Sequence, residues 1–213
     1  MWDMGIIMDT EIQNIDEIEN MKQSKRILTA AFKCISSKGY ANVSLRNIAD
    51  EAGVVLSQLN YYYKNKEGLF IEVVKMLAKQ YSNEIENVLM KGESEKERIT
   101  FLIDYFQKLM RKKSELFRIL FDLTSMSLWS TPLKELLSGL VNNITALIEK
   151  YIFNSFKSKG KKNNYSTATL SRIIFGALFG TSAQVILSNG DKDDVIDSLS
   201  AIEMLFNSYI PAE

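Results

Sequence analysis

The amino-acid sequence predicts an all-α protein with a small three-helix head at its N-terminus and a larger helical body behind it. Apolar residues recur at intervals of three and four along long segments, which is the periodicity of a helix that buries one face. Only two prolines interrupt the chain, Pro132 and Pro211. With 213 residues, of which 46% are hydrophobic, the chain is long enough to bury a sizeable core.

The head is predicted from a series of helix start and stop signals. Serine and asparagine cap helix N-termini because their side chains accept hydrogen bonds from free backbone N–H groups, and glycine ends helices because it adopts positive φ. The predicted elements, in chain order, are a helix near Ser24 to Ser37, a stop at Gly39, a cap at Ser44, a break at Gly53, a short helix near Val55 to Tyr61 and a cap at Asn65 for a long helix.

The body is predicted as a set of longer helices with similar signals. Ser94 and Glu97 have the spacing of a capping box, and Pro132 suits the first turn of a helix. The other predicted features are a helix from Ser114 to Leu128, an N-cap at Thr131 for a helix to about Phe156, a polar mobile connection at 157–164, helices at Tyr165 to Leu187 and Asp194 to Tyr209, a left-handed Gly190 and a cap at Asp191.

Composition excludes several classes of function. The chain has no histidine, so Ser-His-Asp, Cys-His and histidine-metal mechanisms are excluded, and no motif indicates an enzyme, a metal or a cofactor. Cys34, the single cysteine, has the position of a small apolar core residue. No apolar run has the length of about 18 residues needed for a membrane span, and residues 1–20 lack the bases of a signal peptide. We therefore expect a cytoplasmic protein without membrane association.

The formal net charge of zero conceals a segregation of charge along the chain. Residues 1–20 hold six acids and no base, a net charge of −6, whereas residues 21–80 hold ten bases and four acids, a net charge of +6. A basic block of domain size is typical of nucleic-acid binding, because its cations displace counterions from phosphate. We therefore predict an acidic N-terminal extension (1–20), a helix-turn-helix head (21–68) and a helical body (69–213).

Residues 48–62 have the pattern of two short helices packed across a tight turn. Ala49 is small where the helices cross, Gly53 lets the chain reverse, and Val54 fills the gap between them, with Ile48 and Leu59 spaced to pack together. The second helix of such a pair can enter the major groove of DNA. Because any three-helix core could use the same features, the pattern by itself leaves DNA binding open.

One longer stretch resembles a known family. The segment Ile48-Ala-Asp-Glu-Ala-Gly-Val54, followed by Leu59-Asn-Tyr-Tyr-Tyr-Lys-Asn-Lys-Glu-Gly-Leu-Phe70, resembles the DNA-binding head of the TetR family of repressors. The resemblance covers about residues 24–74, and the body matches by helix number and length only. It implies a DNA-binding head, a C-terminal helical domain for ligand binding and dimerisation, and three partners: double-stranded operator DNA, a second copy in a homodimer, and a small-molecule effector of unknown identity.

Carried onto this sequence, the resemblance implies a set of DNA contacts. Ser44, Tyr62 and Lys66 match phosphate contacts, with Lys66 at a helix N-terminus, where an anion is favoured. Arg46 matches a further phosphate contact that could also bond guanine, and Gln58 or Asn60 could bond an adenine edge. The predicted contacts are Ser44, Arg46, Leu56, Ser57, Gln58, Asn60, Tyr61, Tyr62 and Lys66. Two of them depart from the family pattern, Leu56 where a basic residue is common and Asn60 where an aromatic one is common, so the operator sequence of relatives is not transferable.

The body is expected to bind the effector and to form the dimer. Aromatic and methionine side chains favour a small, largely apolar effector, and a Gly-xxx-Gly spacing lets another helix approach closely. The same residues could equally form ordinary intrachain core. The predicted pocket comprises Phe106, Met110, Phe117, Phe121, Met126, Trp129 and Tyr151. The predicted dimer interface comprises Ile173, Gly176, Ala177, Gly180, Thr181, Leu199, Ile202 and Phe206.

The sequence therefore predicts a ligand-responsive DNA-binding regulator, interpreted as a repressor that its effector releases from the operator, although an activator would have the same head. The alternative is an all-helical small-molecule or partner-binding protein without DNA binding, against which Arg46, Gln58 and Lys66 speak. An enzyme using helical carboxylates has no motif behind it. Three interpretations of residues 1–20 stay open: a solvated arm, a shield over the basic head, or an artefact of start assignment with a natural start at Met21.

Overall fold

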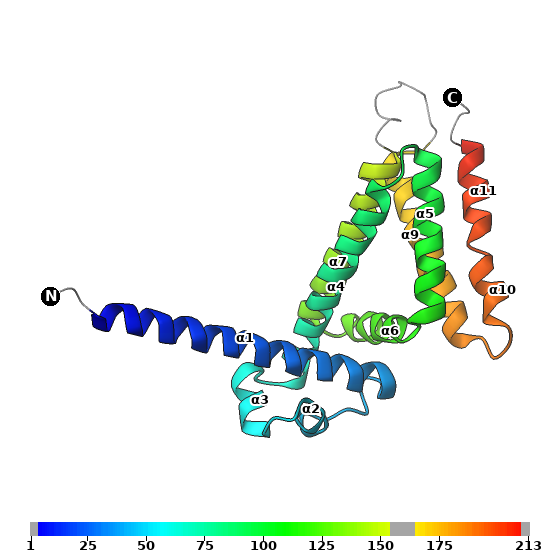
Figure 1. The fold of residues 1–213 in the computed structure, drawn as a ribbon. Coiled ribbons are helices and arrows are strands. Elements are labelled where there is room, and N and C mark those ends of the chain that lie inside the picture. Colours follow the sequence, from blue (N-terminus) through cyan, green and yellow to red (C-terminus); the bar gives the residue numbers. More distant parts are fainter. Residues whose placement is uncertain (1–3, 154–164, 210–213) are drawn as a thin grey trace. The chain divides into compact units, whose positions relative to one another are not determined.

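The computed structural model describes the backbone of residues 4–153 and 165–209 and the side chains of residues 20–153 and 165–205. Within these ranges the secondary structure is helical and contains no strand, which confirms the predicted all-α fold (Figure 1). The chain divides into two compact units, a head, Met1–Val74, and a body, Lys75–Glu213. The connection predicted at 157–164 lies outside the described residues.

The head has short helices whose ends follow the local sequence signals. Gly39 (φ 78°) and Gly53 (φ 63°) adopt the positive φ predicted for stops, and Ser44 and Asn65 cap the helices that follow them. The helices of the head are α1 (Met4–Lys38), α2 (Leu45–Ala52), α3 (Leu56–Tyr62) and the beginning of α4 (Lys66–Met90), which continues into the body.

The predicted start of the first helix at Ser24 is wrong, because α1 begins at Met4. Nothing between these positions stops a helix: the segment contains no proline, and its single glycine, Gly5, lies in the first turn. Proline and internal glycine are the residues that most disfavour helix. The backbone of the acidic extension therefore continues the axis of α1 from Met4 onward.

The core of the head joins all its helices. Fully buried apolar side chains occur at three- and four-residue intervals on the inner faces, which is why these short segments are helical in this context. The side chains that are at most 2% exposed are Ile27, Ala31, Ile35, Val43, Ile48, Ala49, Leu59, Leu69, Phe70 and Val73. Cys34 is 7% exposed, as expected of a core residue.

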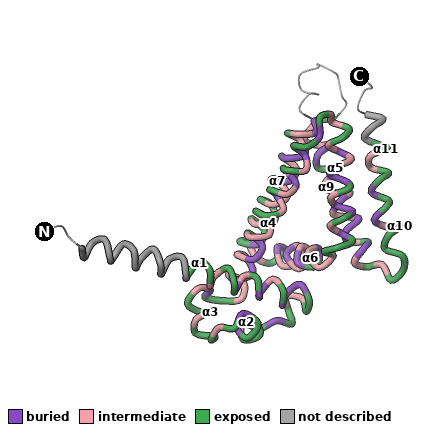
Figure 2. Tube along the Cα trace, viewed as in Figure 1, coloured by how far each residue is buried: buried purple, intermediate pink, exposed green. Residues whose placement is uncertain are grey.

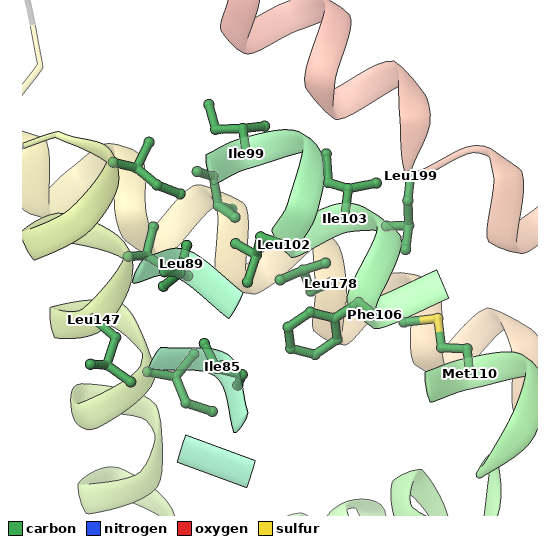
Figure 3. Packing of buried hydrophobic residues seen from close by; sticks show 14 of the residues in the cluster. Ile85, Leu89, Ile99, Leu102, Ile103, Phe106, Met110, Leu147, Leu178 and Leu199 are labelled. Carbon is green, nitrogen blue, oxygen red and sulfur yellow. The ribbon is translucent and has the colours of Figure 1, made fainter. Parts of the chain in front are cut away.

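The body is built from the remainder of α4 and from helices that pack around one apolar cluster. Its other helices are α5 (Glu95–Lys112), α6 (Glu115–Ser127), α7 (Thr131–Ile152), α9 (Thr167–Leu187), α10 (Lys192–Asp197) and α11 (Ser200–Tyr209). Figure 3 shows α4, α5, α7 and α9 contributing side chains to the cluster, among them Ile85, Leu102, Leu147 and Leu178. In Figure 2 buried and exposed residues alternate along each of these helices, as expected for helices with one face in a core.

Several predicted boundaries of the body are confirmed and some are corrected. The capping box of Ser94 and Glu97 and the cap at Asp191 are present. Ser130, rather than Thr131, is the N-cap residue of α7. Gly190 does not have positive φ, because α9 ends with an extended Ser188, and the Gly190 amide donates to the Ser188 hydroxyl (3.2 Å).

The last predicted helix, Asp194 to Tyr209, is two helices, α10 and α11. Between them the Leu199 amide donates to the Ile196 carbonyl (3.1 Å) and the Ile202 amide to the Leu199 carbonyl (3.0 Å). Such i→i+3 bonds tighten the turn to about three residues. Ile196 (2% exposed) and Leu199 (1% exposed) are both buried at this turn.

Candidate nucleic-acid interface

The turn between α2 and α3 is fixed by backbone and side-chain hydrogen bonds. The Ser44 hydroxyl accepts from the Asn47 amide (3.1 Å), and the Asn47 side-chain oxygen accepts from the Ser44 amide (2.9 Å). At the other end of α2 the Val54 amide donates to the Ala49 carbonyl (3.0 Å), a bond that needs a left-handed residue at Gly53. These contacts set the angle at which α3 leaves the turn.

Helix α3 presents one buried and one exposed face. Leu59 is fully buried and anchors α3 in the core of the head. Leu56 is 38% exposed and Tyr61 is 80% exposed, and Ser57 and Asn60 are exposed beside them, whereas Gln58 is half-buried. Five of the predicted contacts therefore lie on α3 with surface available to a partner, and the predicted contacts Ser44 and Arg46 at the start of α2 are also exposed.

Tyr62 and Tyr63 connect the end of α3 to α1. The Tyr62 hydroxyl lies 2.6 Å from the Asn20 side-chain oxygen, to which it donates, and 3.2 Å from that of Gln23. Tyr63 is 8% exposed, its hydroxyl lies 2.8 Å from the Ser24 hydroxyl, and burial raises its pKa. A hydroxyl has one proton to donate, so the Tyr62 hydroxyl must give up its hydrogen bond to α1 before it can donate to a phosphate.

We expect Tyr62→Phe to lower the free energy of unfolding of the head by about 1 kcal/mol, the usual net value of one hydrogen bond. Tyr61→Phe is the matched control, because the Tyr61 side chain is 80% exposed and its replacement should leave stability unchanged. Chemical denaturation of the two variants, followed by tyrosine fluorescence, measures the difference. Equal midpoints for the two variants would show that the Tyr62 hydroxyl does not hold α3 to α1.

Lys66 lies at the first turn of α4, as predicted. The Asn65 side-chain oxygen accepts from the Gly68 amide (2.7 Å) and so caps this helix. The Lys66 ammonium is 4.2 Å from the centroid of the Tyr40 ring and 3.5 Å from the Ala41 carbonyl oxygen. Tyr40 in turn packs against the buried Phe70 ring at 4.9 Å. The half-exposed Lys66 cation is therefore held at a defined place beside the N-terminus of α4. The ammonium charge and the partial positive charge of the helix N-terminus both favour an anion there.

The residues predicted for an effector pocket differ in how far they are buried. Phe106, Met110 and Phe117 are buried in the body cluster, and Phe121 and Tyr151 pack at its edge. Met126 is half-buried. Trp129 is 89% exposed, because it lies in the short connection between α6 and α7, so the structure does not bring it together with the others.

The partners of two tyrosine hydroxyls beside this cluster were not predicted from the sequence pattern. The Tyr105 hydroxyl donates to Glu84 (2.9 Å), and burial raises the pKa of Tyr105. The Tyr151 hydroxyl donates to Glu86 (2.7 Å), and this hydrogen bond lowers the pKa of Glu86. Both pairs join residues more than twenty positions apart in the chain, so no local spacing indicates them.

The residues predicted for the dimer interface divide in a similar way. Ile173 is 53% exposed and Gly176 is exposed, and a Cβ atom at Gly176 or Gly180 would meet nothing within 4 Å. Ala177, Gly180 and Ile202 are half-buried. Two residues pack into the body's own core instead, Thr181 (7% exposed) and Leu199 (1% exposed). The Phe206 side chain lies outside the described residues.

Helix α9 is mostly apolar and contains a single charged residue, Arg172. It is long and apolar enough to cross a membrane by length and composition, although the same is true of core helices in soluble proteins, and 39% of its most apolar window is buried within the chain. A helix this apolar normally has most of its surface buried. Its exposed apolar residues, among them Ile173, are therefore suited to cover by another protein surface.

The fold and the exposed face of α3 define a helix-turn-helix regulator, and comparisons with known proteins agree. Residues 27–73 match the family of bacterial regulatory proteins, tetR family. A probable HTH-type transcriptional regulator, YttP, of Bacillus subtilis (strain 168) is 26% identical over 152 residues, which cover 70% of each chain. The fatty acid metabolism regulator protein of the same strain is 25% identical over 195 residues, 87% of this chain and 96% of that protein.

Solved structures share the fold over almost the whole chain. A TetR transcription regulator from Haloarcula marismortui ATCC 43049 has a TM-score of 0.73 at 16% identity and covers 89% of this chain and 96% of its own. FadR from Bacillus subtilis, in complex with stearoyl-CoA, has a TM-score of 0.74 at 20% identity and covers 88% and 99%. Residues 27–73 therefore form a DNA-binding head of the tetR type, and the chain is a ligand-responsive DNA-binding regulator of transcription. The resemblance seen in residues 24–74 is confirmed.

Proposed function

We propose that the protein is a cytoplasmic, non-enzymatic repressor whose head, residues 21–68, binds operator DNA and whose body, residues 69–213, binds a small, largely apolar effector and a second copy. The observation that carries the proposal is the surface of α3, which exposes Ser57, Asn60 and Tyr61 while Leu59 fixes the helix from behind. A helix held in this way can enter a major groove, about 12 Å wide, without losing its place in the head.

The contacts that we propose for DNA are the nine predicted from the sequence. Ser44, Tyr62 and Lys66 fix the register on phosphates, while Arg46, Gln58 and Asn60 read base edges. The apolar Leu56 is suited to a thymine methyl group. Tyr62 can contact a phosphate only when its hydroxyl donates to a phosphate oxygen instead of the Asn20 side chain. This exchange breaks one exposed hydrogen bond between side chains.

Lys66→Ala is expected to weaken binding to all DNA sequences and to lower the salt slope by about one unit, because one phosphate contact is lost. Gln58→Ala is expected to relax base preference with little change in the slope. Fluorescence anisotropy with the DNA upstream of the protein's own gene and with a scrambled duplex, each at several salt concentrations, separates the two effects. An unchanged slope for Lys66→Ala would refute its phosphate contact.

The proposed effector is a molecule with a long apolar chain, such as the acyl chain of an acyl-CoA. Within the body, Phe106, Met110 and Phe117 line the apolar cluster, and the half-buried Tyr105 and Tyr151 hydroxyls at its edge can orient a polar end. The relative that aligns over 87% of this chain is a fatty acid metabolism regulator, and FadR, which shares the fold, was solved with stearoyl-CoA. These likenesses support the class of effector rather than one molecule.

Stearoyl-CoA is the probe that tests this proposal. At a fixed protein concentration on its upstream DNA, added stearoyl-CoA should reverse the anisotropy increase, whereas coenzyme A without the acyl chain should not. A second measurement, the thermal midpoint of the protein without DNA, should rise with stearoyl-CoA. Release by free coenzyme A to the same extent, or no effect of stearoyl-CoA on either quantity, would contradict an apolar acyl effector.

The proposed homodimer pairs α9 and α11 with their two-fold mates. Exposed Ile173 and Gly176 lie on α9, and exposed Met204 (69%) and Leu205 (60%) lie on α11. A two-fold axis places the same apolar surface on both copies. Two heads in one dimer also read two half-sites, which supplies the specificity that one short α3 lacks.

A further inference from the structure

We propose that a basic groove between α1 and the end of α2 is a second surface for the DNA backbone, beside the contacts of α3. The proposal rests on DNA binding by the head. The groove has a volume of about 530 Å³. Its cations are Lys22, Lys25, Arg26 and Lys33 of α1, and its floor includes Ala30 and Ala52. None of these residues belongs to the contacts already assigned.

The cations form one row along α1. Steps of four and seven residues keep Lys22, Arg26 and Lys33 on neighbouring positions of one helix face, and the row from Lys22 to Lys33 extends about 16 Å at 1.5 Å per residue. All of them are exposed. Glu51, the acid in the lining, is 2.6 Å from the Lys33 ammonium, and this hydrogen bond raises the pKa of Lys33. The four cations and one acid leave the groove with a net charge of +3.

The groove continues directly into the helix-turn-helix. Arg26 Nη2 donates to the Gly53 carbonyl (2.9 Å), and α3 begins three residues later at Leu56, which the chain places at most about 11 Å away. Helix α3 has seven residues and is therefore about 10 Å long. Lys66 follows the C-terminal end of α3, and the basic groove lies near its N-terminal end. Cations therefore flank both ends of the helix that enters the major groove of DNA, which a phosphate strand borders on each side.

The arrangement favours a polyanion over a small anion. A small anion needs donors that converge on one point, whereas these cations are spread along an open groove. A row of this kind matches the repeated charge of a phosphate backbone. Residues 4–20 do not fold back over the groove, since α1 is helical from Met4 through the groove-forming residues to Lys38.

The test is the double variant Lys22→Gln/Lys25→Gln in the full chain, because Arg26 holds the turn and Lys33 is paired with Glu51. We measure anisotropy on a random-sequence duplex of about 30 base pairs between 50 and about 200 mM KCl, a range in which backbone contacts dominate. The salt slope should fall by about 1.8, and affinity at 100 mM should fall on the order of tenfold or more. Lys22→Arg/Lys25→Arg should retain both, because the charge is kept.

Lys96→Gln/Lys108→Gln is the matched control, because it removes two exposed cations from α5 of the body and should leave the slope unchanged. A wild-type slope in the Lys22/Lys25 glutamine variant, or an equal fall in the control, would overturn the proposal. Saturable binding of inorganic pyrophosphate that the glutamine variant loses, without loss of DNA affinity, would assign the groove to a free phosphate compound and also overturn it. If the wild type itself binds no duplex, the proposed DNA-binding function fails instead.

Discussion

Leu59→Ala is expected to abolish DNA binding while the body stays folded. Leu59 is fully buried and is the residue by which α3 is anchored in the core of the head. Removing three of its side-chain carbons leaves a cavity, which typically costs about 2–5 kcal/mol in a well-packed core. A small head has little stability to lose, so the loss should leave α3 without a fixed position.

Hydrogen exchange followed by mass spectrometry measures this effect separately in each unit. In Leu59→Ala, the amides of α1, α2 and α3 should exchange faster, while those of α5 and α9 should be unchanged. Leu56→Ala is the matched control, because it makes the same chemical change on the same helix at a side chain that is 38% exposed. Unchanged exchange in the head of Leu59→Ala would contradict the role of Leu59 as the anchor of α3.

Ile173→Arg is expected to convert the dimer to monomer. Ile173 is 53% exposed on an otherwise apolar α9, and in a two-fold interface its replacement places two charges in the contact. An uncompensated buried charge costs about 3–5 kcal/mol, so the dimer dissociation constant should rise by more than about 100-fold. Specific DNA affinity should fall with it, since one head meets one half-site.

Sedimentation velocity at micromolar concentration measures the oligomeric state. Leu128→Arg serves as control, because Leu128 is 75% exposed in the connection between α6 and α7 and its replacement adds the same charge away from α9 and α11. The variant at Leu128 should remain dimeric. If Ile173→Arg forms a dimer of unchanged affinity, the interface does not include this face of α9.

Local features of the fold were predictable because their causes are local. Ser44, Gly53 and Asn65 act through hydrogen bonds and φ angles within a few residues, so their residue types indicate the turn directly. The family resemblance of residues 24–74 adds the orientation of α3. The start of α1 was wrong because the apolar spacing predicted a helix only from Ser24, whereas no residue upstream of Ser24 breaks the helix that begins at Met4.

Features that depend on distant residues were not predictable from the pattern. Leu199 has the spacing of an interface residue, but it lies between α10 and α11 and is buried in the body's own core. The basic groove depends on contacts between Arg26 and Gly53 and between Lys33 and Glu51, which lie 27 and 18 residues apart. The sequence shows the charge of these residues but not that they share one surface.

Hydroxyl-radical footprinting on the DNA upstream of the protein's own gene tests the central claim most directly. The full-length protein should protect two short, symmetry-related half-sites on one side of the duplex, and Leu59→Ala should remove both. Because each α3 enters one major groove, the half-site centres should be separated by about one or two helical turns. A uniform weak protection of the whole duplex, equal for upstream and scrambled DNA, would contradict the assignment of this protein as a sequence-reading regulator.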